Sequence, residues 1–155
     1  MVASRSLGRS ATPSQNPAAV GYAAALGLVA LGGAAGTLFR YGLGALWVDV
    51  ASVTLAVNLA GAFGLGALVA VLGRAAARSR SGSRAERLRL LLGAGVLGGF
   101  TTYSGLATEA AQLLLGGDAL SAVGYAGLTL VGGLVASLAG MWAGGLGVRR
   151  EARAS

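Results

Sequence analysis

The sequence predicts an all-α membrane protein with four transmembrane helices, the third of which is broken near mid-membrane. Of its 155 residues, 55% are hydrophobic and only 11% are charged, whereas a soluble domain of this length carries far more surface charge. The apolar residues form long runs that can each cross a bilayer. One of these runs contains the stretch Gly98–Ser104, which places two glycines and four hydroxyls where lipid is expected.

Each apolar run reaches the roughly 20 residues that a helix needs to cross the hydrocarbon core. The runs cover Val20–Leu46, Val53–Leu72, Leu90–Leu115 and Leu120–Val148. Residues 1–19 lack the continuous apolar core of a signal peptide and are predicted to be a disordered cytoplasmic leader. Residues 149–155 are predicted to be a basic cytoplasmic tail, which leaves residues 20–148 as one four-helix domain.

Charge is distributed unequally between the connections. The leader, the second connection and the tail hold the arginines Arg5, Arg9, Arg74, Arg78, Arg80, Arg84, Arg87, Arg89, Arg149, Arg150 and Arg153. The only charged residues in the other two connections are Asp49 and Asp118. Because arginine excess marks the cytoplasmic side, we expect a multi-pass protein of the cell membrane with both termini inside.

Small residues recur at four-residue spacing within the runs. They are Gly32 and Gly36, Ala60 and Gly64, Gly95 and Gly99, and Gly132, Ala136 and Gly140. Small residues at this spacing let helix backbones approach closely in lipid. Since four thin helices enclose little space, we expect a dimer or a larger assembly.

Several functional classes are excluded or disfavoured by composition. The chain has no cysteine and no histidine, so thiol chemistry, Cys/His metal sites and histidine bases are excluded. With no nucleophile–base pair to assemble, we do not expect an enzyme. Nucleic-acid binding is disfavoured because no aromatic residues alternate with the arginines. The run Gly93–Gly98 matches G-x-G-x-x-G, but it follows no strand and does not predict dinucleotide binding.

The Gly98–Ser104 stretch predicts a broken helix. Adjacent glycines followed by β-branched Thr101 and Thr102 weaken helix continuity. A break frees carbonyl and N–H groups, which must find partners or an ion. The hydroxyls of Tyr103 and Ser104, with Tyr125 and Thr129 on the fourth run, are each unremarkable singly, since serine and threonine hydroxyls in membrane helices often bond back to the preceding turn. Their clustering favours a polar path.

Three further polar residues allow two interpretations each. Asn58 lies inside the second run, so its amide must face either another helix or a wet path. Arg40, near the outer end of the first run, either extends to the headgroups or concentrates anions in an outer vestibule. Glu109, two turns beyond Thr102, likewise either lies at the membrane interface or has a functional role at the vestibule. Neutral donors with a peripheral cation suit a small anion, because a proton-coupled pump would need a buried carboxylate or histidine.

Three motifs resemble the CrcB/Fluc family of small four-helix fluoride channels. They are Gly32–Tyr41, Thr54–Phe63, and Gly98–Ser104 with Glu109. The resemblance implies a fluoride-selective channel that passively exports fluoride, built as an antiparallel, double-barrelled dimer. It also implies one structural Na⁺ at the dimer interface, held by the backbone carbonyls of Gly98 and Thr101.

The resemblance further implies which residues line the fluoride pore. They are Asn58, Tyr103, Ser104, Tyr125 and Thr129, with Arg40 and Glu109 at the vestibule. The family has two phenylalanines three residues apart where this chain has Tyr103 and Leu106, and the next polar position on the fourth helix is Gly133. One pore lining is therefore expected to be incomplete.

The charge asymmetry predicts the kind of partner. An antiparallel homodimer requires one sequence to insert in both orientations, yet the arginines of the connections lie on one side only. We therefore expect a heterodimer with a paralogue of opposite topology. The alternatives are a small multidrug-type transporter, which would need a glutamate in the first run, and a non-conducting membrane subunit.

Overall fold

All regular structure in the described part of the chain is helical, as the sequence predicts. The computed structural model describes residues 21–46, 49–78 and 83–154. Its elements are α1 (Tyr22–Leu46), α2 (Val50–Arg78), α3 (Ser83–Leu88), η1 (Arg89–Leu97), α4 (Gly98–Phe100), α5 (Tyr103–Leu115) and α6 (Ala119–Ala154). By length and composition, four stretches of the described residues can cross a membrane: Tyr22–Leu46, Val50–Ala77, Ser83–Leu115 and Ala119–Leu146. The four predicted spans are confirmed, although the third begins at Ser83 and not at Leu90, and the second extends to Ala77 and not only to Leu72.

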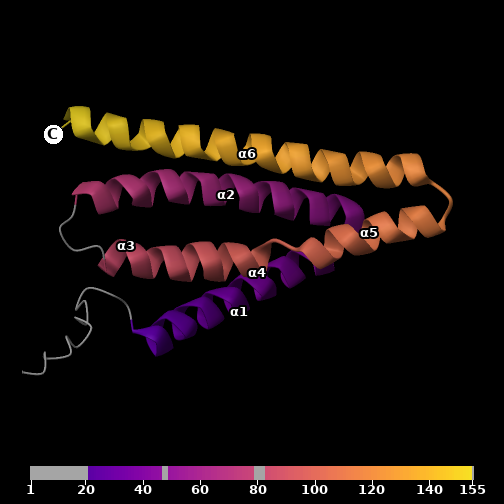
Figure 1. Cartoon of the computed structure of the whole chain (residues 1–155), viewed down its shortest axis with the longest axis horizontal. Coiled ribbons are helices and arrows are strands. Elements are labelled where there is room, and N and C mark those ends of the chain that lie inside the picture. Colours follow the sequence, from indigo (N-terminus) through magenta and orange to yellow (C-terminus); the bar gives the residue numbers. More distant parts are fainter. Residues whose placement is uncertain (1–20, 47–48, 79–82, 155) are drawn as a thin grey trace, which may run out of the picture.

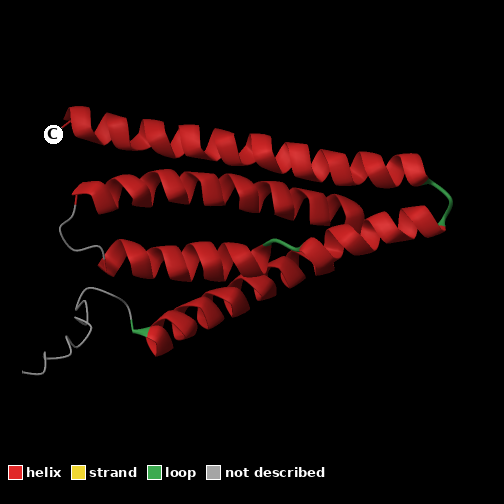
Figure 2. Ribbon diagram, viewed as in Figure 1, coloured by secondary structure: helices red, strands yellow, loops and turns green. Residues whose placement is uncertain are grey.

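Consecutive spans run in opposite directions (Figures 1 and 2). The third span is a composite of α3, η1, α4 and α5, and α5 crosses towards the start of α6 (Figure 1). The start of α1, the end of α2, the start of α3 and the end of α6 lie at the same end of the bundle (Figure 1). The arginine-rich second connection and tail therefore adjoin the same end, as the predicted topology requires. The predicted leader, residues 1–19, lies outside the described residues.

The helices pack in two close pairs. α2 packs mainly against α6, while α1 packs against η1 and α4 and hardly touches α2. Large apolar side chains such as Leu38, Leu130 and Trp142 remain exposed. This is the expected surface for a bundle whose solvent is lipid, since no hydrophobic force draws such side chains inwards there.

Glycines make both close pairs possible. A Cβ atom at Gly36 would collide with the carbonyl of Val96, and one at Gly99 would collide with the carbonyl of Gly33. Between α2 and α6, a Cβ at Gly140 would meet the carbonyl of Phe63. Backbone-to-backbone packing of this kind confirms the close approach that the small-residue spacing predicts.

The third span is broken at the threonine pair. Gly98 keeps a helical backbone (φ −64°, ψ −38°) and α4 continues to Phe100. Thr101 (φ −76°, ψ 156°) and Thr102 (φ −143°, ψ 116°) are extended. The prediction of a break within Gly98–Ser104 is confirmed, and the extended residues in that stretch are the two threonines, not the glycines. The β-branched residues adopt the extended backbone that suits them, while Gly99 serves the contact with α1.

The connection between α5 and α6 is a tight turn closed by a helix cap. Gly117 takes a left-handed backbone (φ 81°), which glycine adopts without steric cost. The Asp118 carboxylate accepts the backbone N–H of Ser121 at 3.0 Å and so caps α6. Hydrogen bonds from the Ser121 side chain and then its backbone hold the pKa of Asp118 below its ordinary value.

Candidate functional site

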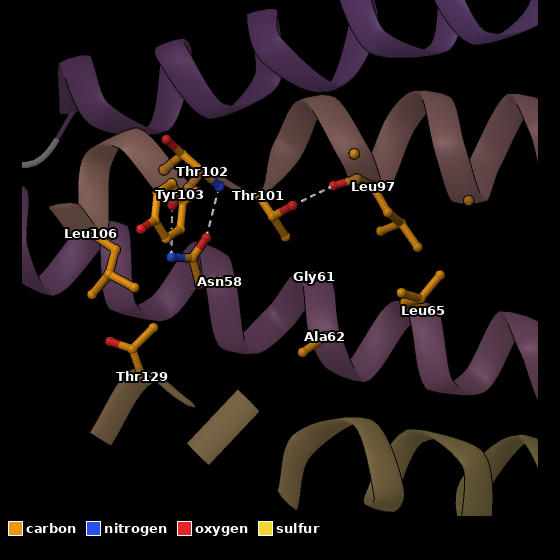
Figure 3. A pocket seen from close by; sticks show the side chains of 12 residues that line it. Asn58, Gly61, Ala62, Leu65, Leu97, Thr101, Thr102, Tyr103, Leu106 and Thr129 are labelled. Carbon is orange, nitrogen blue, oxygen red and sulfur yellow. Dashed lines mark hydrogen bonds between the residues drawn. The ribbon is translucent and has the colours of Figure 1, made fainter. Parts of the chain in front are cut away.

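Asn58 forms a two-point hydrogen-bonded pair with the backbone of Thr102. Its Nδ2 donates to the Thr102 carbonyl at 3.1 Å, and its Oδ1 accepts the Thr102 N–H at 2.8 Å (Figure 3). Because Thr102 is extended, its N–H has left the helical ladder, and the amide side chain replaces that partner. An asparagine amide has two N–H donors. The Asn58–Thr102 pair uses one of them and leaves the second for another acceptor.

The break leaves several carbonyls without a helical partner. The Gly99 carbonyl accepts hydrogen bonds from Thr37 Oγ1 at 3.3 Å and Arg40 Nε at 3.4 Å. Among the described residues, no hydrogen bond of ordinary geometry reaches the carbonyl oxygens of Gly98, Phe100 or Thr101. Free carbonyls in a membrane need a partner, which can be another chain, water or a cation.

These free carbonyls are the chemically suitable ligands for a hard cation. The described residues contain no cluster of three or more His, Cys, Asp or Glu side chains that could hold a metal ion. Backbone oxygens are the donors that hard alkali and alkaline-earth cations prefer. The predicted pair, Gly98 and Thr101, is therefore compatible in donor chemistry with a sodium ion.

Two hollows lie next to the break. The first, which we call the central groove, has a volume of about 330 Å³ and lies between α2, the third span and α6. The second, the α1–α2 hollow, has a volume of about 300 Å³. Thr102, whose backbone is bonded to the Asn58 amide, borders both hollows, and Asn58 itself lines the central groove.

The structure brings together most of the residues that the sequence singled out. The central groove is lined by Asn58, Gly98, Thr101, Tyr103 and Thr129, among others (Figure 3). Leu106 lines the same groove and is almost fully buried. Arg40 lines the α1–α2 hollow. Distant segments of the sequence therefore converge on the break, and the hydrogen-bonded residues Asn58 and Thr102 are themselves 44 positions apart.

Other predicted residues lie beside the hollows and do not line them. Ser104 shares a hydrogen bond of 3.1 Å with the Thr102 hydroxyl. The Tyr125 phenol donates to the Ala51 carbonyl at 3.1 Å, which ties α6 to the start of α2. Glu109, half-buried on α5, lines neither hollow.

Two side chains of the groove differ in how their polar groups are used. Thr129 is only 6% exposed, and its hydroxyl donates to the Tyr125 carbonyl at 2.9 Å. Its proton is therefore engaged by the preceding turn of its own helix, which is the structural role that sequence reasoning allowed. Tyr103 is 83% exposed although it lines the groove, so most of its side chain is not covered by the rest of the subunit.

Sequence reasoning missed the roles of Thr37 and of the Thr102 backbone. Thr37 stands three residues before Arg40 on α1, a spacing that places both side chains on one helix face. That spacing is a weak signal by itself, because it does not say which carbonyl of a distant segment the two side chains reach.

Comparisons with known proteins agree on one family. Residues 27–141 match the family described as "CrcB-like protein, Camphor Resistance (CrcB)". A protein of Thermus thermophilus named "Fluoride-specific ion channel FluC" is 43% identical over 124 residues, which cover 76% of this chain and 91% of the relative. A protein of Chloroflexus aurantiacus with the same name is 38% identical over 127 residues, covering 76% and 95%. "Fluoride-specific ion channel FluC 1" of Cutibacterium acnes is 44% identical over 104 residues, covering 64% and 71%.

Proposed function

The chain belongs to the CrcB family, and from this premise we propose that it is a subunit of a fluoride channel in the cell membrane. The observation that carries the proposal is the likeness to proteins named fluoride-specific ion channels, which spans 91% of the Thermus thermophilus relative. The matched residues 27–141 include the Asn58–Thr102 pair and the break. Passive export through such a channel lowers the fluoride concentration in the cytoplasm. No relative reported above is a multidrug transporter or an enzyme by name.

The chemistry of the two hollows suits a small, strongly hydrated anion. The charge of Arg40 attracts anions to the α1–α2 hollow, and the free N–H of Asn58 replaces part of the ion's hydration shell. Tyr103 supplies a ring edge with positive potential and a hydroxyl donor. Ser104 and Tyr125 extend the polar path, and Glu109, which lines neither hollow, is assigned to the vestibule. Thr129, whose proton is donated to the Tyr125 carbonyl, accepts hydrogen bonds from water in the path and does not donate to the anion.

We further propose that the carbonyls of Gly98 and Thr101 hold one structural Na⁺ together with the same carbonyls of a second subunit. The support is that both carbonyls lack a hydrogen bond within the described residues. Such an ion supplies positive charge that compensates the carbonyl dipoles where two broken helices meet. No charged side chain is needed for this role.

A second subunit in antiparallel orientation completes the groove in this proposal. The exposed ring of Tyr103 and the free carbonyls lie on surfaces that one subunit leaves open. Because the arginines of the connections all fall in segments predicted to lie on one side of the membrane, a copy inserted the other way would place them all outside. A paralogue of opposite charge bias is therefore the partner that we propose.

Reconstitution tests the function and the partner together. The chain is purified alone or co-expressed with a candidate paralogue, and fluoride and chloride efflux from liposomes are measured. We expect fluoride efflux well above chloride efflux from the co-expressed pair and little from the chain alone. Equal fluoride efflux from the chain alone would contradict the heterodimer, and absence of fluoride efflux from both would contradict the channel function.

Substituting serine for Gly133 is expected to increase fluoride flux severalfold. The ideal Cβ position at Gly133 lies 4.0 Å from the Cβ of Ala62, an ordinary van der Waals contact that leaves room for the side chain. Ala62 lines the central groove, so the new hydroxyl adds a donor one turn beyond Thr129. Initial fluoride efflux rates of the heterodimer check this.

Gly127→Ser is the matched control, because a Cβ at Gly127 meets nothing within 4 Å. We expect its flux to equal that of the unmodified channel. An unchanged flux in Gly133→Ser as well would show that this position does not limit conduction.

A further inference from the structure

The carbonyl of Gly99 is held by two side chains of α1. Thr37 Oγ1 donates to it at 3.3 Å and Arg40 Nε donates to it at 3.4 Å. These contacts join residues 62 and 59 positions apart in the sequence. In a continuous helix the Gly99 carbonyl would accept the N–H of Tyr103 instead, so both donors replace a bond that the break removes.

The same short segment of α1 touches the break at other points. The backbone of Gly33 packs directly on Gly99, since a Cβ added at Gly99 would collide with the Gly33 carbonyl. The rings of Phe39 and Phe100 stack with centroids 5.5 Å apart. The position of Gly99 is therefore determined by α1 through a backbone contact, a ring contact and two hydrogen bonds.

We propose that Thr37 and Arg40 are positioning residues that hold the Gly99 carbonyl and thereby keep Thr101 and Thr102 extended. If the Gly99 carbonyl were unpaired in the membrane, the third span would regain hydrogen bonds by closing into a continuous helix. Closure would withdraw the Thr102 backbone from Asn58. The hydrogen bond from Arg40 Nε acts separately from the attraction of its charge for anions.

The proposal deepens the proposed function, on which its flux readout rests. Arg40 also lines the α1–α2 hollow, so one side chain connects the anion-attracting surface with the backbone of the break. Charge and hydrogen bonding can be separated because lysine keeps the charge but lacks a guanidinium Nε. Thr37→Val removes the other donor with almost no change in volume and none in charge.

Hydrogen exchange measures the break directly, without any need for fluoride. Arg40→Lys, Arg40→Gln, Thr37→Val and Thr37→Ser are prepared in the co-expressed heterodimer, and amide exchange is followed in peptides that cover residues 100–106. Thr108→Val is the matched control, because Thr108 is exposed on α5 and its hydroxyl has no hydrogen bond among the described residues. Fluoride efflux of each variant is measured in parallel.

We expect exchange in residues 100–106 to rise about fivefold in Thr37→Val and Arg40→Lys, as the loss of one hydrogen bond implies. Their fluoride efflux falls, whereas Thr37→Ser and Thr108→Val behave like the unmodified protein. Unchanged exchange in both Thr37→Val and Arg40→Lys would overturn the proposal. Normal fluoride efflux in Arg40→Lys together with reduced efflux in Arg40→Gln would also overturn the proposal, because Arg40 would then act through its charge alone.

The exchange result stands even if the channel function fails. A heterodimer that conducts no fluoride would contradict the proposed function, while the exchange rates would still decide whether Thr37 and Arg40 hold the break. If Thr37→Val did not fold, Arg40→Lys would supply the same comparison from the other donor.

Discussion

Replacement of Asn58 by alanine is expected to reduce fluoride flux by at least about tenfold and to lower the free energy of unfolding by about 2–4 kcal/mol. The substitution removes both hydrogen bonds of the Asn58–Thr102 pair, and it leaves the Thr102 N–H and carbonyl without that partner inside the membrane. It also removes the free N–H that we assign to the anion. Efflux from liposomes measures the first effect and thermal unfolding in detergent the second.

Gln112→Ala is the control for loss of an amide. Gln112 lies exposed on α5, and its side chain has no hydrogen-bond partner in the part of the chain that the structure describes. We expect flux and stability to remain within experimental error. Full fluoride flux in Asn58→Ala would contradict the pore assignment, whatever its effect on stability.

Replacement of Gly36 by leucine is expected to destabilise the protein by about 3 kcal/mol or more, near or beyond the upper end of typical overpacking effects. A Cβ at Gly36 would collide with the carbonyl of Val96 and approach the Phe100 N to 2.8 Å. Backbone atoms cannot rotate away as a side chain can, so α1 must separate from η1 and α4. Loss of the contact with Gly99 should also reduce flux.

Gly27→Leu on the same helix provides the comparison. A Cβ at Gly27 meets nothing within 4 Å, and leucine has a higher helix propensity than glycine. We expect this variant to unfold at the same or a slightly higher temperature. Equal unfolding temperatures for Gly36→Leu and Gly27→Leu would contradict the backbone packing of α1 on the third span.

The membrane class, the four spans and the sites of close helix packing could be predicted from local sequence. Apolar length, glycine spacing and arginine asymmetry act within one helix or one connection, so they can be read without knowing which helices are neighbours. The break was predicted as well, and within the predicted stretch the extended residues are Thr101 and Thr102. Glycine can break a helix, but here close packing against α1 keeps Gly99 helical.

The partners of the polar groups were decided only by the tertiary structure. The sequence indicated that Asn58 and Arg40 need partners, yet it left two interpretations open for each. Packing brought Asn58 to the Thr102 backbone and Arg40, with Thr37, to the Gly99 carbonyl, across 44 to 62 residues. Hydrogen bonds require the donor and acceptor to lie within a few tenths of an ångström of their best separation, and the register between two helices, which depends on all of their contacts together, sets that distance.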